Sequence, residues 1–304
     1  GAVTSRRMAG AGARLEAPAI CVGNLTVGGA GKTPTVIALA QMLQAMGKTP
    51  FVVSRGYGGS SAGPLRVDPA RHDAALVGDE PLEISRRAPV VVARDRLAGA
   101  RMAISAGADV VLLDDGLQNP SIRKDLVFAV IDGETWFGNG YCLPAGPLRA
   151  PIDQQAPHVH AAIVIGGEMR QEEARAFSGK PIFRAQIEPD EKAVASLVGR
   201  RVLAFAGIGR PEKFFDMLRA RGIDVVAVEG FADHQPFSDE VLARLNDHAM
   251  KGGLALATTG KDLARIGDAR ARAAFGDRLT TVPINLTFTD RQAVQALASK
   301  ALQT

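Results

Sequence analysis

The sequence predicts an α/β protein that combines a mostly parallel sheet, flanked by helices, with a second and smaller α/β domain. Short runs of Val, Ile and Leu alternate with segments of helical periodicity along almost the whole chain. Continuous apolar runs are typical of parallel strands that are buried on both faces. The first such run leads into a glycine-rich turn ending in Gly-Lys-Thr and then into a helix. This strand–turn–helix order predicts a sheet of the P-loop NTPase type.

The elements of the first domain are expected to follow one another as strand and helix. Residues 19–22 are expected to form a buried strand. Residues 33–46 are expected to form a helix, because their apolar side chains fall on one face and Gly47 follows as a stop signal. The elements expected after these are strand 50–54, helix 81–87, strand 89–93, helix 96–106, strand 110–113 and strand 126–131.

A second series of strands and helices begins near residue 200. The elements expected there are strand 202–206, helix 211–221, strand 224–228, helix 238–250 and strand 254–258. Two flanking segments, 182–187 and 282–288, have a period of two residues and are expected to pair as a two-stranded linker. The linker would return a tail helix, 291–302, to the first domain. The predicted boundaries are therefore 1–181 for the nucleotide-binding domain, with 289–304 packed back on it, and 182–288 for the smaller domain with its linker strands.

Composition limits the classes of function. The 304 residues correspond to about two domains at roughly 150 residues each. A formal net charge of +4 fits an anionic ligand such as a nucleotide or an acidic membrane face. Only 5% of the residues are aromatic and no basic stripe contains them, which argues against a nucleic-acid-dependent ATPase. Two cysteines, Cys21 and Cys142, do not make a disulfide framework, as is typical of a cytosolic protein.

The glycine-rich turn carries the strongest chemical signal. Its glycines allow backbone N–H groups to converge on phosphate oxygens, and the N-terminus of the following helix adds partial positive charge. Lys32 is expected to reach the β- and γ-phosphates and Thr33 to hold Mg²⁺. An ordinary strand–helix turn is the alternative, and Thr26 stands where the usual motif has its first glycine. The predicted nucleotide-binding residues are Thr26, Val27, Gly28, Gly29, Ala30, Gly31, Lys32 and Thr33.

Four apolar residues followed by Asp114 and Asp115 form a second signal. A carboxylate at the end of a strand beside a P-loop is placed to meet Mg²⁺, directly or through water. The alternative is a strand that ends in a polar Asp-Asp-Gly turn. Beside a P-loop the metal interpretation is favoured, with either Asp114 or Asp115 nearest the ion.

Other polar residues follow predicted strands or lie in a long loop. Asp95 follows strand 89–93 and could accept a proton from a substrate hydroxyl. It equally suits the N-cap of the next helix, and the two roles are compatible. Arg55, in the loop 54–59, could bind a phosphate. Taken alone, such a loop is more often only a flexible connection. Arg149 is the candidate in the Gly- and Pro-rich loop that ends there. The guanine-binding pattern Asn/Thr-Lys-x-Asp has one residue between its Lys and Asp, whereas Lys261 and Asp262 are adjacent. The sequence therefore argues against a guanine-specific GTPase.

Taken together, these motifs resemble the lipid A 4′-kinase (tetraacyldisaccharide 4′-kinase) family. They occur in family order between about residues 20 and 262. The matching stretches are VGNLTVGGAGKTP (22–34), SRGYGG (54–59), GDEP (78–81), ARDR (93–96), LLDDGLQ (112–118), GNG with LPAGPLR (138–149), AFAGIGRPEKFF (204–215), FADHQPFS (231–238) and TTGKD (258–262).

The resemblance implies Mg²⁺-dependent transfer of the γ-phosphoryl group of ATP to the 4′-hydroxyl of a tetraacylated, 1-phosphorylated glucosamine disaccharide, to give the lipid A precursor lipid IVA. It implies a Gram-negative source and work at the cytoplasmic face of the inner membrane. The implied partners are the lipid substrate and an anionic membrane surface, with no nucleic acid and no protein partner. Family members commonly begin with a hydrophobic segment, so a chain that starts at Gly1 is expected to lack it.

The resemblance also implies roles for single residues. Lys32 and Thr33 match the phosphate and metal residues, and Asp114 and Asp115 match the acidic pair at the metal. Asp95 matches the proposed general base, and His234 matches the histidine that would pair with it when the two domains close. Arg149 matches an arginine beside the phosphates, while Asn24 and Arg55 are expected to bind substrate. This chain departs from the family pattern at Asn119, Ala150 and Gly260.

Two questions stay open at the level of sequence. A P-loop switch or metallochaperone-type ATPase is the alternative function, although such proteins often have Cys and His clusters that this chain lacks. The arginines Arg6, Arg7 and Arg14 could contact anionic headgroups, or form a solvated tail.

Overall fold

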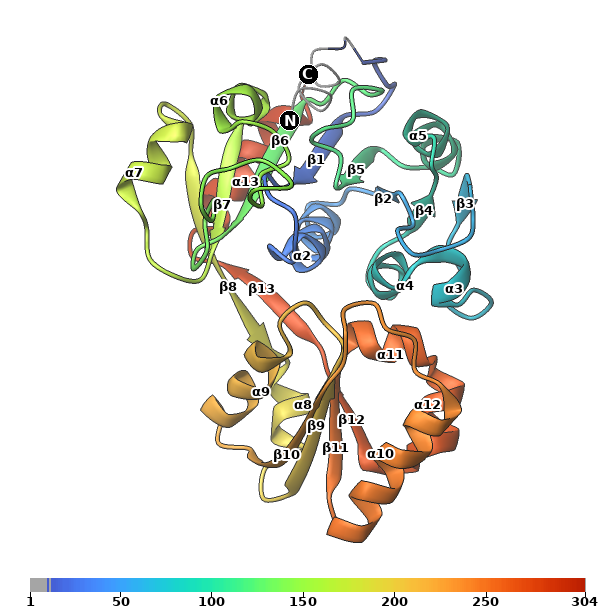
Figure 1. The fold of residues 1–304 in the computed structure, drawn as a ribbon. Coiled ribbons are helices and arrows are strands. Elements are labelled where there is room, and N and C mark those ends of the chain that lie inside the picture. Colours follow the sequence, from blue (N-terminus) through green and yellow to red (C-terminus); the bar gives the residue numbers. More distant parts are fainter. Residues whose placement is uncertain (1–9, 11, 304) are drawn as a thin grey trace.

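The computed structural model describes Gly10 and residues 12–303, so Arg6 and Arg7 lie outside the described residues. The predicted α/β class is confirmed, because a nine-stranded, mostly parallel sheet and a four-stranded sheet are both flanked by helices. Figure 1 shows the larger domain above the smaller one, with two strands running between them. In the part of the chain described, no helix combines the length and the apolar character needed to span a bilayer.

The larger sheet is parallel except at its two edges, where β3 pairs with β4 and β13 with β8 in the antiparallel sense. Its strands, in spatial order, are β13 (Ile284–Phe288), β8 (Ile182–Pro189), β7 (Ala161–Ile165), β6 (Leu126–Asp132), β1 (Ala19–Gly23), β5 (Val110–Asp114), β2 (Pro50–Ser54), β4 (Val90–Val92) and β3 (Leu65–Arg66). Its helices are α2 (Lys32–Ala45), α3 (Ala74–Val77), α4 (Asp79–Ser85), α5 (Arg96–Ser105), α6 (Ile152–Gln155), α7 (Gln171–Ala174) and α13 (Arg291–Ala301).

Both faces of this sheet are buried, which explains the continuous apolar runs. Successive residues of a strand point to opposite faces, so Ile20 lies in the apolar cluster that includes residues of α2 and α13, while Cys21 lies in the cluster that includes residues of α5. Val294 and Ala298 of α13 lie in the same apolar cluster as Leu39 of α2. The tail helix therefore packs on the larger domain.

The smaller sheet is parallel throughout. Its strands, in spatial order, are β10 (Asp224–Gly230), β9 (Arg201–Ala206), β11 (Ala255–Thr259) and β12 (Leu279–Val282). Phe214 and Leu218 lie in the apolar cluster on one face, and Leu245 and Phe275 in the cluster on the other. The helices are α8 (Glu191–Ala195), α9 (Pro211–Ala220), α10 (Asp239–Gly252), α11 (Gly260–Ile266) and α12 (Asp268–Phe275).

The segments between the domains differ from the sequence expectation in one respect. Strands β8 and β13 do pair, with Leu286 opposite Ile187. The expected strand 282–288 is divided, however, because β12 ends at Val282 in the smaller sheet and β13 begins at Ile284 in the larger one. Pro283 lies at the division, where its missing N–H leaves no break in either ladder. The expected linker is thus the edge of the nine-stranded sheet.

Candidate active site

The glycine-rich turn joins β1 to α2 and presents the first turn of that helix. Gly31 is the N-cap of α2 with a φ of 89°. Its positive φ favours glycine, and a Cβ atom at this position would also lie 2.5 Å from Cδ1 of Ile165, whose side chain would have to move. No side chain in the described part of the protein caps α2. The N–H groups of its first turn therefore remain available to an anion such as the phosphates of a nucleotide.

Lys32, Asp115 and Arg149 meet beside this turn. Oδ2 of Asp115 lies 2.9 Å from Nη2 of Arg149 and 4.0 Å from Nζ of Lys32. Asp115 has a φ of 52°, a left-handed conformation that is rare for a residue with a side chain. Strained residues of this kind persist only where their surroundings hold them. The three charged groups form one cluster at the carboxyl end of β5.

Asp114 lies beneath this cluster and is only 2% exposed. Its Oδ2 accepts a 2.9 Å hydrogen bond from Oγ of Ser54, whereas its buried Oδ1 has no partner among the residues described. Burial, together with the charges of Glu80 and Asp115, raises the pKa of Asp114 to about 6. Unpaired carboxylate oxygens are the ligands that Mg²⁺ prefers. Thr33, Asp114 and Asp115 are accordingly the residues that could hold this ion.

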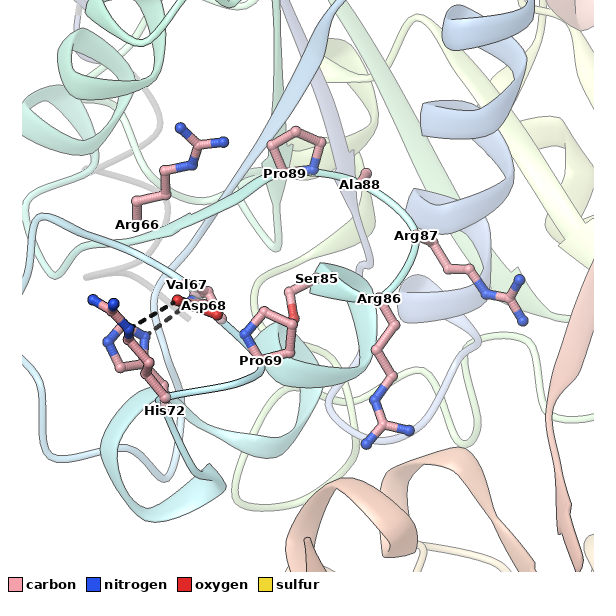
Figure 2. A pocket seen from close by; sticks show the side chains of 11 residues that line it. Arg66, Val67, Asp68, Pro69, His72, Ser85, Arg86, Arg87, Ala88 and Pro89 are labelled. Atoms are coloured by element: carbon pink, nitrogen blue, oxygen red, sulfur yellow. Dashed lines mark hydrogen bonds and ion pairs between the residues drawn. The ribbon is translucent and has the colours of Figure 1, made fainter. Parts of the chain in front are cut away.

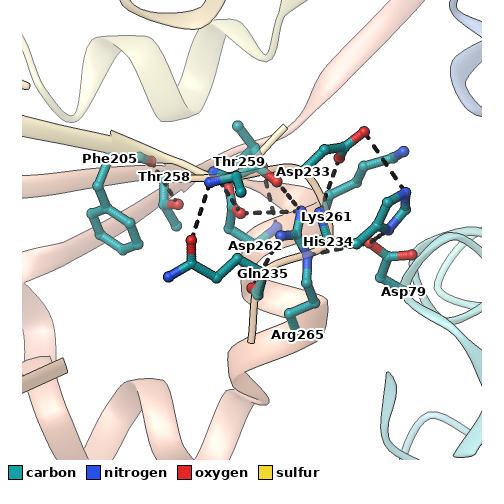
Figure 3. A network of polar contacts seen from close by, with 12 residues as sticks. Asp79, Phe205, Asp233, His234, Gln235, Thr258, Thr259, Lys261, Asp262 and Arg265 are labelled. Atoms are coloured by element: carbon teal, nitrogen blue, oxygen red, sulfur yellow. Dashed lines mark hydrogen bonds and ion pairs between the residues drawn. The ribbon is translucent and has the colours of Figure 1, made fainter. Parts of the chain in front are cut away.

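A second cluster joins the two domains. Asp79, the first residue of α4, is 4% exposed, and its Oδ2 lies 3.0 Å from Nδ1 of His234 and 3.2 Å from Nε of Arg265. His234 comes from the loop that follows β10 and has a left-handed φ of 58°. Its ring meets the edge of Tyr57, with centroids 5.5 Å apart. Figure 3 shows His234 and Arg265 of the smaller domain approaching Asp79.

The expected contact between Asp95 and His234 is not formed. Oδ1 of Asp95 instead accepts hydrogen bonds from the N–H groups of Leu97, at 2.9 Å, and Ala98, at 3.1 Å. Asp95 is thus the N-cap of α5, the alternative role that its position before a helix suggested. His234 pairs with Asp79 because α4 packs against the smaller domain, where α11 contacts it. The stretch GDEP pointed to Asp79, but nothing local in the sequence connects it with His234.

The stretch TTGKD has a structural part and an interdomain part. Thr259 caps α11 by accepting from the N–H of Asp262 at 3.1 Å. Lys261 reaches across to the larger domain, where its Nζ lies 2.5 Å from Oε1 of Glu80. A Cβ atom at Gly260 would lie 2.9 Å from Oε1 of Glu83, so the glycine leaves room for that carboxyl group.

Ion pairs also join the domains on the side of β6. Asp132, the last residue of β6, pairs with Arg210, and Lys213 of α9 lies 2.6 Å from Glu134. The nearby cations, together with hydrogen bonds, hold the pKa of Asp132 below its usual value despite the opposing effect of burial. Charged contacts therefore connect the smaller domain to α4 as well as to the carboxyl end of β6.

The remaining predicted residues are placed as follows. Asn24 is fully buried, and neither atom of its side-chain amide has a partner within the described residues. Arg55 is exposed on the loop after β2. Thr33 is buried in the first turn of α2, beside Lys32. The structure thus brings Lys32, Asp115 and Arg149 together. Asp95 does not join them, because its carboxylate accepts from N–H groups at the start of α5.

A hollow of about 700 Å³ lies elsewhere, near the amino end of β4. Its arginine side chains do not converge, since those of Arg66, Arg86 and Arg87 point in different directions in Figure 2. Arg86 is also engaged by Asp268 at 3.0 Å. The P-loop and the interdomain cluster, both near the carboxyl ends of the strands, are therefore the candidate active site.

Comparisons with known proteins show which family this chain resembles. The family model described as tetraacyldisaccharide-1-P 4′-kinase matches residues 1–303. A tetraacyldisaccharide 4′-kinase from Bradyrhizobium sp. strain BTAi1 is 50% identical over 305 residues, which cover 99% of this chain and 88% of that protein. One from Methylobacterium sp. strain 4-46 is 52% identical over 286 residues, with 93% and 86% covered.

Among solved structures, LpxK from Aquifex aeolicus in complex with ATP has a TM-score of 0.78 at 26% identity. The superposition covers 99% of this chain and 93% of that one. The whole two-domain arrangement, and not the P-loop sheet alone, is therefore similar. This chain belongs to the tetraacyldisaccharide-1-P 4′-kinase family.

Proposed function

We propose that this protein transfers the γ-phosphoryl group of ATP to the 4′-hydroxyl of tetraacyldisaccharide 1-phosphate, giving lipid IVA. The observation that carries the proposal is the juxtaposition of two parts. One is a P-loop with Lys32, Asp115 and Arg149 at its side. The other is a buried carboxylate–imidazole pair, Asp79 and His234, between the domains. The first suits a nucleotide, and the second suits a hydroxyl group that must lose a proton.

The P-loop side would hold the nucleotide. The N–H groups at the start of α2, together with Lys32 and Arg149, would surround the phosphates and spread the charge of the transferred group. Thr33, Asp114 and Asp115 would hold Mg²⁺, which supplies charge neutralisation at the phosphate oxygens when it is bound. The oxygen of Asp114 that has no partner among the described residues supports this assignment.

The Asp79–His234 pair would take the proton of the sugar hydroxyl. Nδ1 of His234 faces the carboxylate of Asp79, and Nε2, which lies 3.7 Å from Oδ2 of Asp233, would be the ring nitrogen that turns to a substrate. Asp79 fixes the orientation of the ring and stabilises its protonated form, as buried carboxylates do for catalytic histidines. Asp95, which caps α5, is the base that the sequence predicts, and variants of both residues distinguish the two assignments.

Glu80 connects the two halves of the site. Although burial raises the pKa of Glu80, nearby positive charge, with Lys261 foremost, brings it below the ordinary value, and both Lys32 and the ring of His234 act on this carboxylate. Glu80 is therefore within electrostatic reach of both the P-loop and the base. Closure of the smaller domain would thus complete the site and exclude water, which otherwise competes with the sugar hydroxyl.

The direct test is transfer of label from γ-labelled ATP to detergent-solubilised tetraacyldisaccharide 1-phosphate. Label is expected in the lipid, and it is expected to disappear with Lys32→Ala or with EDTA. Label that appears only as free phosphate, with or without acceptor, would instead support an ATPase of the switch or metallochaperone type.

We also propose that the protein works at the cytoplasmic face of the bacterial inner membrane. A net charge of +4 and an acylated substrate support contact with an anionic surface. The test is co-sedimentation with phosphatidylglycerol vesicles and with phosphatidylcholine vesicles, in low and high salt. Equal partitioning into both kinds of vesicle would contradict attraction to anionic lipid.

A further inference from the structure

A buried glutamine lies directly behind the P-loop, outside the motifs described above. Gln155, the last residue of α6, is fully buried. Its Nε2 donates to the carbonyl oxygens of Leu25, at 3.2 Å, and Ala150, at 2.6 Å. Its Oε1 accepts from Nε2 of Gln118 at 2.9 Å. Both donors and the acceptor of this amide are therefore engaged, which fixes its orientation.

Gln118 passes this orientation on to Arg149. Its Nε2 is occupied by Gln155 and by the carbonyl oxygen of Asn24, at 2.8 Å. Its Oε1 is thereby turned toward Arg149, whose Nη1 donates to it at 3.3 Å. The same guanidinium holds Asp115 through Nη2 at 2.9 Å. A continuous series of hydrogen bonds thus runs from Gln155 through Gln118 and Arg149 to Asp115.

The same three side chains hold the backbone that enters the P-loop. Gln118 donates to the carbonyl of Asn24, Gln155 to that of Leu25, and Arg149, through Nε at 3.2 Å, to that of Thr26. Three successive carbonyl groups are therefore each bound by a side chain from a different part of the fold. Hydrogen bonds of this kind, in a buried network, favour one arrangement over its alternatives.

Asp115 shows why such support is needed. Its left-handed backbone is costly, and its carboxylate faces two cations. The guanidinium of Arg149 is planar and rigid, so its hydrogen bond to the carboxylate of Asp115 forms only in one orientation and position of the group. Gln118 sets that position on one side and the carbonyl of Thr26 sets it on another.

We infer that Gln155 is a positioning residue for phosphoryl transfer, acting through Gln118 and Arg149 on Asp115 and on the entrance of the P-loop. It touches no reacting group itself. Its loss lets the side chain of Gln118 rotate, so Arg149 and Asp115 no longer meet the phosphates in one geometry. The inference rests on the proposed kinase function, and it makes a separate prediction for nucleotide binding.

The test compares Gln155→Met with Gln154→Met in the full chain. Gln154 is exposed on the same helix, so its variant is the matched control. Gln155→Met is expected to lower kcat for lipid phosphorylation by about 10- to 100-fold, the usual range for residues that orient a site from behind. It is also expected to weaken binding of the fluorescent nucleotide mant-ATP. Gln154→Met is expected to change neither quantity.

A double variant separates positioning from packing. Gln118→Met breaks the same series of bonds from a less buried place, so Gln118→Met/Gln155→Met should lose little more kcat than either single variant. If the loss of kcat in the double variant equals the product of the losses in the two single variants, the inference is overturned. So would a lower melting temperature of Gln155→Met with normal kcat and normal mant-ATP binding, because packing alone would account for it.

Two further outcomes are informative. If Gln155→Met does not fold, Gln118→Met tests the series of bonds alone, and a normal kcat with normal mant-ATP binding would refute it. If the wild-type chain does not phosphorylate the lipid, the proposed function fails, but mant-ATP binding still decides the inference. Equal affinity of Gln155→Met and Gln154→Met for mant-ATP would then refute the positioning role.

Discussion

Nδ1 of His234 lies 3.0 Å from Oδ2 of Asp79, although 155 positions separate the two residues in the chain. Asp79 begins α4 in the larger domain, and His234 belongs to a loop of the smaller one. The pair therefore exists only while the two domains are in contact. In the proposed mechanism, proton removal would therefore depend on contact between the domains, which would assemble the base where water is excluded.

Loss of either member of this pair should impair chemistry more than binding. Asp79→Asn and His234→Ala are each expected to lower kcat by ~10²–10⁴, the usual range for acid–base groups. The double variant should lose much less than the product of the two effects, because both residues act as one unit. Steady-state kinetics of lipid phosphorylation, at saturating ATP, would measure this. Normal turnover by His234→Ala would remove the pair from the mechanism.

Asp95 should behave as a helix cap. Asp95→Ala is expected to cost about 0.5–2 kcal/mol of stability, because the N–H groups of Leu97 and Ala98 lose their acceptor. Asp95→Asn should keep most of that stability, since asparagine also caps helices, and it should keep kcat. Urea unfolding together with kinetics would check both. A large loss of kcat in Asp95→Asn would return the role of base to Asp95, as the sequence suggested.

The pair Lys261–Glu80 should contribute to the interdomain contact. Its partners lie 2.5 Å apart, and both are largely shielded from water. Lys261→Met is expected to destabilise the protein by about 1.5–3 kcal/mol, the range for hydrogen bonds to charged groups. Adding Glu80→Gln should recover part of this loss, because the carboxylate then no longer lacks a partner. Urea unfolding of the single and double variants measures the coupling, and simple additivity would argue against it.

Glu83 should make stability fall as pH rises. Burial raises its pKa from 4.5 to about 7, which outweighs the opposite effect of Lys261. Between these two values the folded protein keeps a proton that the unfolded chain has lost, so stability decreases with increasing pH in that interval. Glu83→Gln should match the wild type near pH 4, below both values, and melt at a higher temperature near pH 8. A difference in melting temperature that does not vary with pH would contradict this assignment.

The sequence by itself determined the local chemistry of the nucleotide side. A strand, a glycine-rich turn and a helix are adjacent in the chain, so Gly31, Lys32 and Thr33 could be placed without knowledge of the rest of the fold. The apolar runs likewise identified most of the buried strands, since burial on both faces leaves a continuous pattern. The paired linker strands could be foreseen from their period of two residues.

The tertiary structure alone decided which distant groups meet. The pairing of His234 with Asp79 and not with Asp95 depends on which helix faces the smaller domain, and no local pattern encodes that choice. Gln155 lies in no recognised motif, and its role emerges only because three segments bring their hydrogen-bonding groups to one point behind the P-loop. The segment 282–288 is likewise divided at Pro283 because its two parts pair in different sheets, and only the tertiary structure determines this pairing. Local geometry follows from neighbouring residues, whereas contacts across the sheet and between domains follow from how the whole chain packs.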